Sequence, residues 1–256
     1  MLLFKKKYKY IFLIIPLVLL YRYDLVLFGD STEESVGECF LSHLFGGSYR
    51  MEHLNLSISI LGLLGIIFLS LLFADYIVHD ISENTEYIFS RYSNRKIWYR
   101  EKLLGTFGYC NLGIFLYILF YIFRAVQESQ CGITQKDILL ILCTYIMLVL
   151  FSYFSIVCIN LLVFYYGISI GFVLYYSALI ISSITAYIIQ KFPHTTTTGV
   201  LHRINPMSNI FVSWNFNSSY ILWGMGYYFV ICVLVSYVLW RKIKKHEIGI
   251  NVRTET

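Results

Sequence analysis

The side chains that most often carry out chemistry in proteins are sparse in this chain and far apart. No two of its histidines have the i, i+4 spacing with which a helix presents two ligands to one metal ion. They are His43, His53, His79, His194, His202 and His246. The His-Glu-x-x-His pattern of zinc proteases does not occur. We therefore expect no metal, no cofactor and no enzymatic activity.

Glycine-rich phosphate loops are absent as well, so the chain is not expected to bind ATP or a dinucleotide by itself. Four cysteines fall inside apolar runs, where we expect small buried side chains. Cys39 and Cys131 fall in segments expected outside the cell, where an oxidising environment permits a disulfide. Sequence does not fix their separation, so two separate thiols remain the alternative.

The elements that position these residues are predicted from hydropathy. Of the 256 residues, 58% are hydrophobic and 14% are charged. A helix needs about 20 apolar residues to cross the hydrocarbon core of a membrane, because lipid cannot hydrogen-bond to its backbone. Six runs qualify, at residues 10–28, 54–78, 103–123, 138–162, 164–189 and 220–240. The sequence thus predicts an all-α membrane protein, a single domain over residues 1–256, with a tight hairpin near Asn160 to Gly171.

Basic residues predict the orientation of these spans. With the N-terminus inside, fourteen of the twenty Lys and Arg residues fall in cytoplasmic segments, where such residues accumulate. We therefore expect a multi-pass protein of the plasma membrane with both termini in the cytoplasm. The cations cluster at the ends of apolar runs, which accounts for the net charge of +5 without a nucleic acid partner.

Three polar segments are longer than a simple connection needs. In the cytoplasmic segment 79–102, Ser82 can cap a short helix, and Ile88 and Tyr92 have i, i+4 spacing. This pattern predicts an amphipathic helix under the membrane, followed by a bend at Ser93 and Asn94. A basic interfacial loop is the alternative.

The other two long segments are expected outside the cell. Segment 29–53 carries five carboxylates and one arginine, which would attract a cationic ligand, although a solvated loop has the same composition. Segment 191–219 combines turn residues with Phe211, Trp214 and Phe216. This mixture favours short helices re-entering the outer leaflet over a plain loop.

In its order of parts, the chain resembles the membrane subunit of ABC-2 type exporters. The most specific similarity is the run Ser90-Arg91-Tyr92-Ser93-Asn94-Arg95-Lys96-Ile97-Trp98-Tyr99-Arg100-Glu101-Lys102-Leu103. It looks like the polar and aromatic run before the third span in small permeases of Gram-positive bacteria, several linked to bacteriocin export or self-protection.

The resemblance implies a permease that works with a separate ABC ATPase and a second permease subunit, identical or different, in the lipid membrane. The cargo would be an amphiphilic peptide or a lipid-like molecule. The segment between spans two and three would be the coupling helix that docks on the ATPase. Its docking residues would be Glu83, Glu86, Tyr87, Phe89, Arg91 and Tyr92.

Two rival functions remain open. A stand-alone immunity or receptor-like membrane protein would bind a toxin through segment 29–53 and need no ATPase. An intramembrane enzyme would need ionisable groups clustered at membrane depth, and the sequence offers no such cluster.

Overall fold

The computed structural model describes residues 35–45, 64–73, 76–81, 95–129, 132–191, 196–210 and 218–245. Within these ranges every regular element is a helix, which confirms the all-α prediction. The helices are α2 (Val36–Phe45), α4 (Leu64–Phe73), α6 (Arg95–Glu128), α7 (Gln135–Tyr166), α8 (Ile168–Lys191), α9 (Thr196–Ile204), α10 (Pro206–Ile210) and α11 (Ser218–Lys245). A further short helical segment covers residues 76–81.

Four of these helices, α6, α7, α8 and α11, are long and apolar enough to cross a membrane. They correspond to the third to sixth predicted spans and extend beyond most of the predicted limits. The predicted span at 10–28 lies outside the described residues. Only 64–73 and 76–78 of the predicted span at 54–78 are described, as α4 and the start of the next helical segment.

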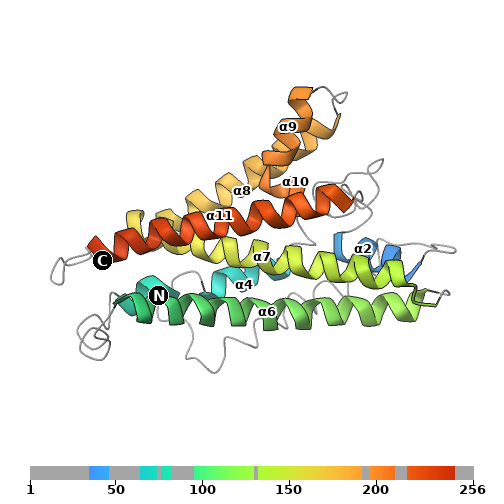
Figure 1. Ribbon diagram of the computed structural model, residues 1–256, viewed down its shortest axis with the longest axis horizontal. Helices are drawn as coiled ribbons and strands as arrows, with labels where there is room; N and C mark the ends of the chain where they lie inside the picture. The colour runs from blue at the N-terminus through green and yellow to red at the C-terminus, as the bar shows by residue number, and fades with distance from the viewer. Residues whose placement is uncertain are drawn as a thin grey trace.

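Helix α7 forms the centre of the bundle. It packs against α4, α6, α8 and α11, and it is the most buried of the four long helices. Figure 1 shows α6, α7 and α11 running side by side, whereas α8 diverges from α7 toward the end where α9 and α10 lie. Three buried hydroxyls of α7, on Thr144, Ser152 and Ser155, donate to carbonyls four residues earlier. Small polar side chains therefore remain hydrogen-bonded inside an apolar helix.

A tight hairpin joins α7 to α8, as predicted, but the boundary differs. Helix α7 runs to Tyr166 rather than 162, and Gly167 alone separates it from α8. Gly167 has φ 85°, a left-handed conformation that costs little only for glycine. Asn160 lies inside α7 and is fully buried, so it is not part of the turn. An asparagine was a poor marker of the turn because its amide is hydrogen-bonded within the bundle.

The close approach of α8 to α7 at Gly171 makes a prediction. A Cβ at this position would lie 2.7 Å from the backbone nitrogen of Val163. We expect Gly171→Ala to reduce the free energy of unfolding by about 1–2 kcal/mol, because backbone must move to admit the methyl group. The measurement is denaturation in mixed micelles. Gly108→Ala is the matched control, since nothing lies within 4 Å of its Cβ position; equal effects of the two substitutions would contradict the prediction.

Part of the segment predicted as an acidic outer loop is a buried helix. Helix α2 lies against α6 and α7, with Val36, Phe40, Leu44 and Phe45 almost entirely inaccessible to solvent. Burial of these apolar side chains outweighs the polar composition of the segment around them. Residues 36–45 therefore form a buried helix rather than a freely solvated loop.

Candidate functional site

The six residues predicted to dock on an ATPase, Glu83 to Tyr92, lie outside the described residues. The structure does describe the elements on either side, which are residues 76–81 and the first turns of α6. Those turns lie at the same end of the bundle as the α7–α8 hairpin and the last turns of α11 (Figure 1). This end is the basic end, defined by Arg95, Lys96, Arg100, Lys102, Arg241, Lys242, Lys244 and Lys245.

Residues 76–81 are anchored in a separate apolar cluster at the basic end. Ile77 and Ile81 are almost completely buried, and they pack with residues of three long helices. Those residues are Trp98 and Tyr99 of α6, Val157 of α7, and Leu239 and Ile243 of α11. The segment that precedes the predicted coupling helix therefore touches three long helices at once.

An ion pair adds a charged contact to this anchor. The Lys102 ammonium of α6 binds the Asp80 carboxylate. Its Nζ also lies 4.2 Å from the centre of the Tyr76 ring, a cation–π distance. Both charged side chains are mostly shielded from solvent, at 18% and 30% exposed. Lys102 thus connects the base of α6 to both ends of the short helical segment.

Asn160 links α4 and residues 76–81 to the central helix. Its side-chain oxygen accepts from the Ile77 N–H at 3.0 Å, and its amide nitrogen donates to the carbonyls of Phe73 at 3.2 Å and Ile156 at 2.8 Å. Helix α4 ends at Phe73, so its last carbonyl lacks a partner within the helix. In an apolar bundle such a group needs a replacement partner, and the Asn160 side chain supplies it.

Helices α6 and α11 are joined at the same end by aromatic residues. The Tyr99 hydroxyl donates to the Ser236 carbonyl at 2.7 Å, and the Tyr99 ring stacks on Trp240 with centroids 5.5 Å apart. A displacement of the α6 base would therefore carry the end of α11 with it.

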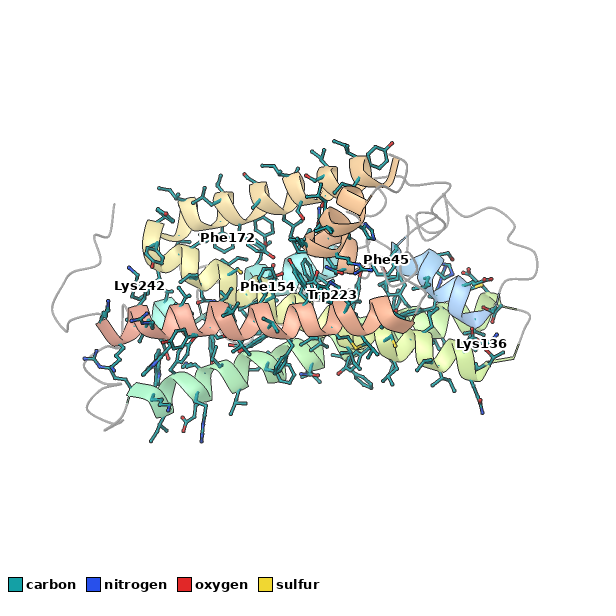
Figure 2. The ribbon with its side chains drawn as sticks, turned by 45° about the horizontal axis from the view of Figure 1, so that its top comes forward. Phe45, Lys136, Phe154, Phe172, Trp223 and Lys242 are labelled. Carbon is teal, nitrogen blue, oxygen red and sulfur yellow. The ribbon has the colours of Figure 1, made fainter. Side chains whose placement is uncertain are left out.

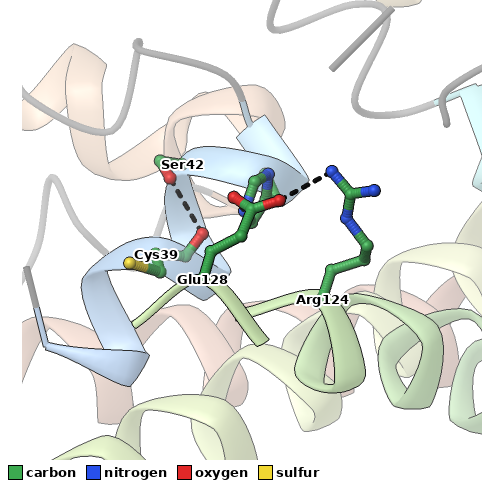
Figure 3. A network of polar contacts seen from close by, with 5 residues as sticks. Cys39, Ser42, Arg124 and Glu128 are labelled. Atoms are coloured by element: carbon green, nitrogen blue, oxygen red, sulfur yellow. Dashed lines mark hydrogen bonds and ion pairs between the residues drawn. The ribbon is translucent and has the colours of Figure 1, made fainter. Parts of the chain in front are cut away.

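A second polar group lies at the opposite end, where α2 meets α6 (Figure 3). Glu128 accepts from Arg124 at 2.7 Å and pairs with His43 Nε2 at 2.7 Å. The Arg124 side chain is only 12% exposed and is held by this ion pair. Nearby, Asp137 accepts from the Gly37 N–H at 3.0 Å while it caps α7 with Thr134. These contacts fix α2 on the bundle.

Helices α9 and α10 are held by side chains of α8 and α11. The Asn205 amide oxygen accepts from the Ser182 hydroxyl at 2.7 Å and from the Met207 N–H at 2.8 Å. From α11, Tyr227 donates to the Ile204 carbonyl at 2.5 Å, and Tyr228 donates to the Pro206 carbonyl. Two short helices, α9 and α10, are thus present in segment 191–219 and are held between two long helices, whereas Phe211, Trp214 and Phe216 lie outside the described residues.

The cysteines and other potential metal ligands form no cluster in the part of the chain that the structure describes. Cys39 is buried in α2, whereas Cys131 is outside the described residues, so their pairing stays a prediction. Cys110, Cys143, Cys158 and Cys232 are reduced thiols within the long helices.

Sequence reasoning did not identify Asn160, Asp80, Lys102 or Asn205 as contact residues. Asn160 had a usable signal, because a lone amide inside an apolar run must find a partner. The Asp80–Lys102 pair had no such signal in the sequence, since the two residues are 22 positions apart and belong to different helices.

Comparison of the chain with protein-family models, with curated proteins and with solved structures finds no match. The class defined by the fold is an all-helical protein with four helices long and apolar enough to cross a membrane. That architecture is compatible with a multi-pass membrane protein.

Proposed function

We propose that this protein is the membrane permease subunit of an ATP-driven exporter of the ABC-2 type. In this proposal it has six spans, including residues 10–28 and 54–78, and lies in the plasma membrane. The basic end and both termini face the cytoplasm, in keeping with the accumulation of cations there. A separate ATPase supplies the energy, and a second permease subunit completes the transport pathway.

The observation that carries the proposal is the anchoring of residues 76–81. They lead directly into the segment that would dock on the ATPase, and they contact α6, α7 and α11 through Ile77, Asp80 and Ile81. Packed helices move as rigid bodies more readily than they deform. A displacement at Glu83 to Tyr92 would therefore shift three long helices together.

The contacts at the end of the bundle opposite the basic end support a transport pathway that opens toward the outside of the cell. Helices α9 and α10 are held to α8 and α11 by hydrogen bonds through Asn205, Tyr227 and Tyr228. In the proposal this unit is the outer re-entrant segment, and it moves when α11 moves. An amphiphilic peptide or lipid-like cargo suits the mostly apolar exposed faces of α8 and α11, and bacteriocin export or self-protection is the setting suggested by the resemblance.

The experiment is affinity purification of the tagged protein from its native host in mild detergent. We expect a nucleotide-binding subunit to co-purify, and we expect the double charge reversal Glu83→Lys/Glu86→Lys to remove it. Glu38→Lys is the control, since Glu38 is an exposed carboxylate at the other end of the bundle. If no ATPase accompanies the unsubstituted protein, the proposal fails. Protection of a sensitive host by this protein expressed alone would favour an immunity protein instead.

A further inference from the structure

We infer that the C-terminal end of α11 binds the headgroup of an anionic phospholipid. The inference goes beyond the proposed function. It needs the bundle to lie in a membrane, and it does not need an ATPase.

The first observation is an apolar stripe that runs into a group of cations. On α11, Val230, Val233, Leu234, Tyr237 and Val238 are each between 42% and 56% exposed. Their spacing continues on the same face into Arg241 and Lys245, which are also exposed. Acyl chains that cover the stripe would bring the lipid phosphate to the level of these two cations.

The second observation is an aromatic belt at the same level. Tyr165 and Tyr166, beside the α7–α8 hairpin, are 46% and 55% exposed. Lys242 lies with its Nζ 4.2 Å from the Tyr165 ring centre, and the Arg241 guanidinium lies 5.9 Å from the Tyr237 ring centre. Tyrosines and basic residues with an apolar stem favour the headgroup region of a membrane. Figure 2 shows Lys242 at one end of the bundle and Lys136 at the other.

The third observation is an excess of positive charge among the described residues at this end of the bundle. Over residues 76–81, 95–102, 160–171 and 236–245, the carboxylates are Asp80 and Glu101, and Asp80 already binds Lys102. Within the described chain, Arg241, Lys242, Lys244 and Lys245 make no ion pair with a carboxylate. A lipid phosphate fits better than an acidic protein surface, because the cations directly continue the exposed apolar stripe.

The test is native mass spectrometry of the delipidated full-length protein, titrated with phosphatidylglycerol or with phosphatidylcholine of the same acyl chains. We expect phosphatidylglycerol to bind more tightly. We expect Arg241→Gln/Lys245→Gln to reduce that preference about ten- to thirtyfold, as the loss of two interfacial cations implies. Both side chains are exposed, so the fold should persist, and circular dichroism checks this.

The matched control is Lys96→Gln/Arg100→Gln, which removes two exposed cations from α6 at the same end. It should keep most of the preference, and so should the charge-preserving variant Arg241→Lys/Lys245→Arg. Equal binding of the two lipids by the unsubstituted protein would overturn the inference. So would equal losses in the α11 and α6 variants, which would indicate diffuse attraction. Loss of ATPase co-purification by the α11 variant, without a lipid preference, would assign these cations to a protein partner.

Discussion

Replacement of Asn160 by leucine should destabilise the protein by about 2–4 kcal/mol. The substitution keeps a similar side-chain volume but removes the partner of the Ile77 N–H and of the Phe73 carbonyl. Each buried polar group left without a partner costs about 1–3 kcal/mol. The measurement is the free energy of unfolding in mixed micelles, combined with hydrogen exchange of the Ile77 amide, which should become faster.

Two further variants sharpen this result. In Ser152→Ala, the lost hydroxyl had donated only to a carbonyl of its own helix, so we expect a small effect. Asn160→Asp keeps an acceptor for Ile77, and as the neutral acid that burial favours it keeps one donor where Asn160 has two, so its stability should fall between the other two. If Asn160→Leu were as stable as Ser152→Ala, Asn160 would not link α4 and residues 76–81 to α7.

Charge reversal at Asp80 is expected to have the second large effect. Asp80→Lys places two cations together at the base of α6, where both side chains are largely shielded. Removing one partner from a fully buried pair costs about 3–5 kcal/mol, so this partly exposed pair should lose about 2–3 kcal/mol. In the proposed exporter, the variant should also lose transport while it retains ATPase binding, because the link between residues 76–81 and α6 is weakened.

The compensating variant is Asp80→Lys/Lys102→Asp, which restores an ion pair with its charges exchanged. We expect it to recover at least half of the lost stability, and a double-mutant cycle measures the coupling. As a control, Arg124→Glu reverses a charge at the opposite end and should not be rescued by changes at position 102. Failure of the exchanged pair to recover any stability would argue against direct coupling.

Much of the fold was predictable because lipid imposes a strong rule. The apolar runs that became α6, α7, α8 and α11 could be identified from hydropathy alone, since only helices satisfy their own backbone in such an environment. The boundary between α7 and α8 was harder. Residues 138–189 contain no charged residue, and the buried Asn160 is a more conspicuous interruption than Gly167.

Helix α2 has an apolar repeat that is easy to overlook in a segment rich in carboxylates. Val36, Phe40 and Leu44 repeat every four residues, which is the spacing of an apolar helix face, and all three are buried. The neighbouring carboxylates directed attention to charge instead. The ion pair between Arg124 and Glu128 likewise has a visible i, i+4 spacing, whereas the His43 contact depends on how α2 docks.

The site was less predictable than the fold. The docking residues Glu83 to Tyr92 were assigned through resemblance, and they lie outside the described residues. The contacts of Asn160, Lys102 and Asn205 join helices distant in sequence, and no local pattern encodes such pairs. The sequence does show which polar side chains lie inside apolar runs, and such side chains are expected to need hydrogen-bonding partners.

The most direct test of the central claim is the membrane sidedness of the segment after residues 76–81. In a background with all six cysteines replaced, Tyr87→Cys and Gly132→Cys would be exposed to a membrane-impermeant maleimide in intact cells. We expect Gly132→Cys, in the turn between α6 and α7, to react at once, and Tyr87→Cys to react only after permeabilisation. Reaction of Tyr87→Cys in intact cells, with Gly132→Cys protected, would contradict a cytoplasmic basic end and a coupling segment within reach of an ATPase.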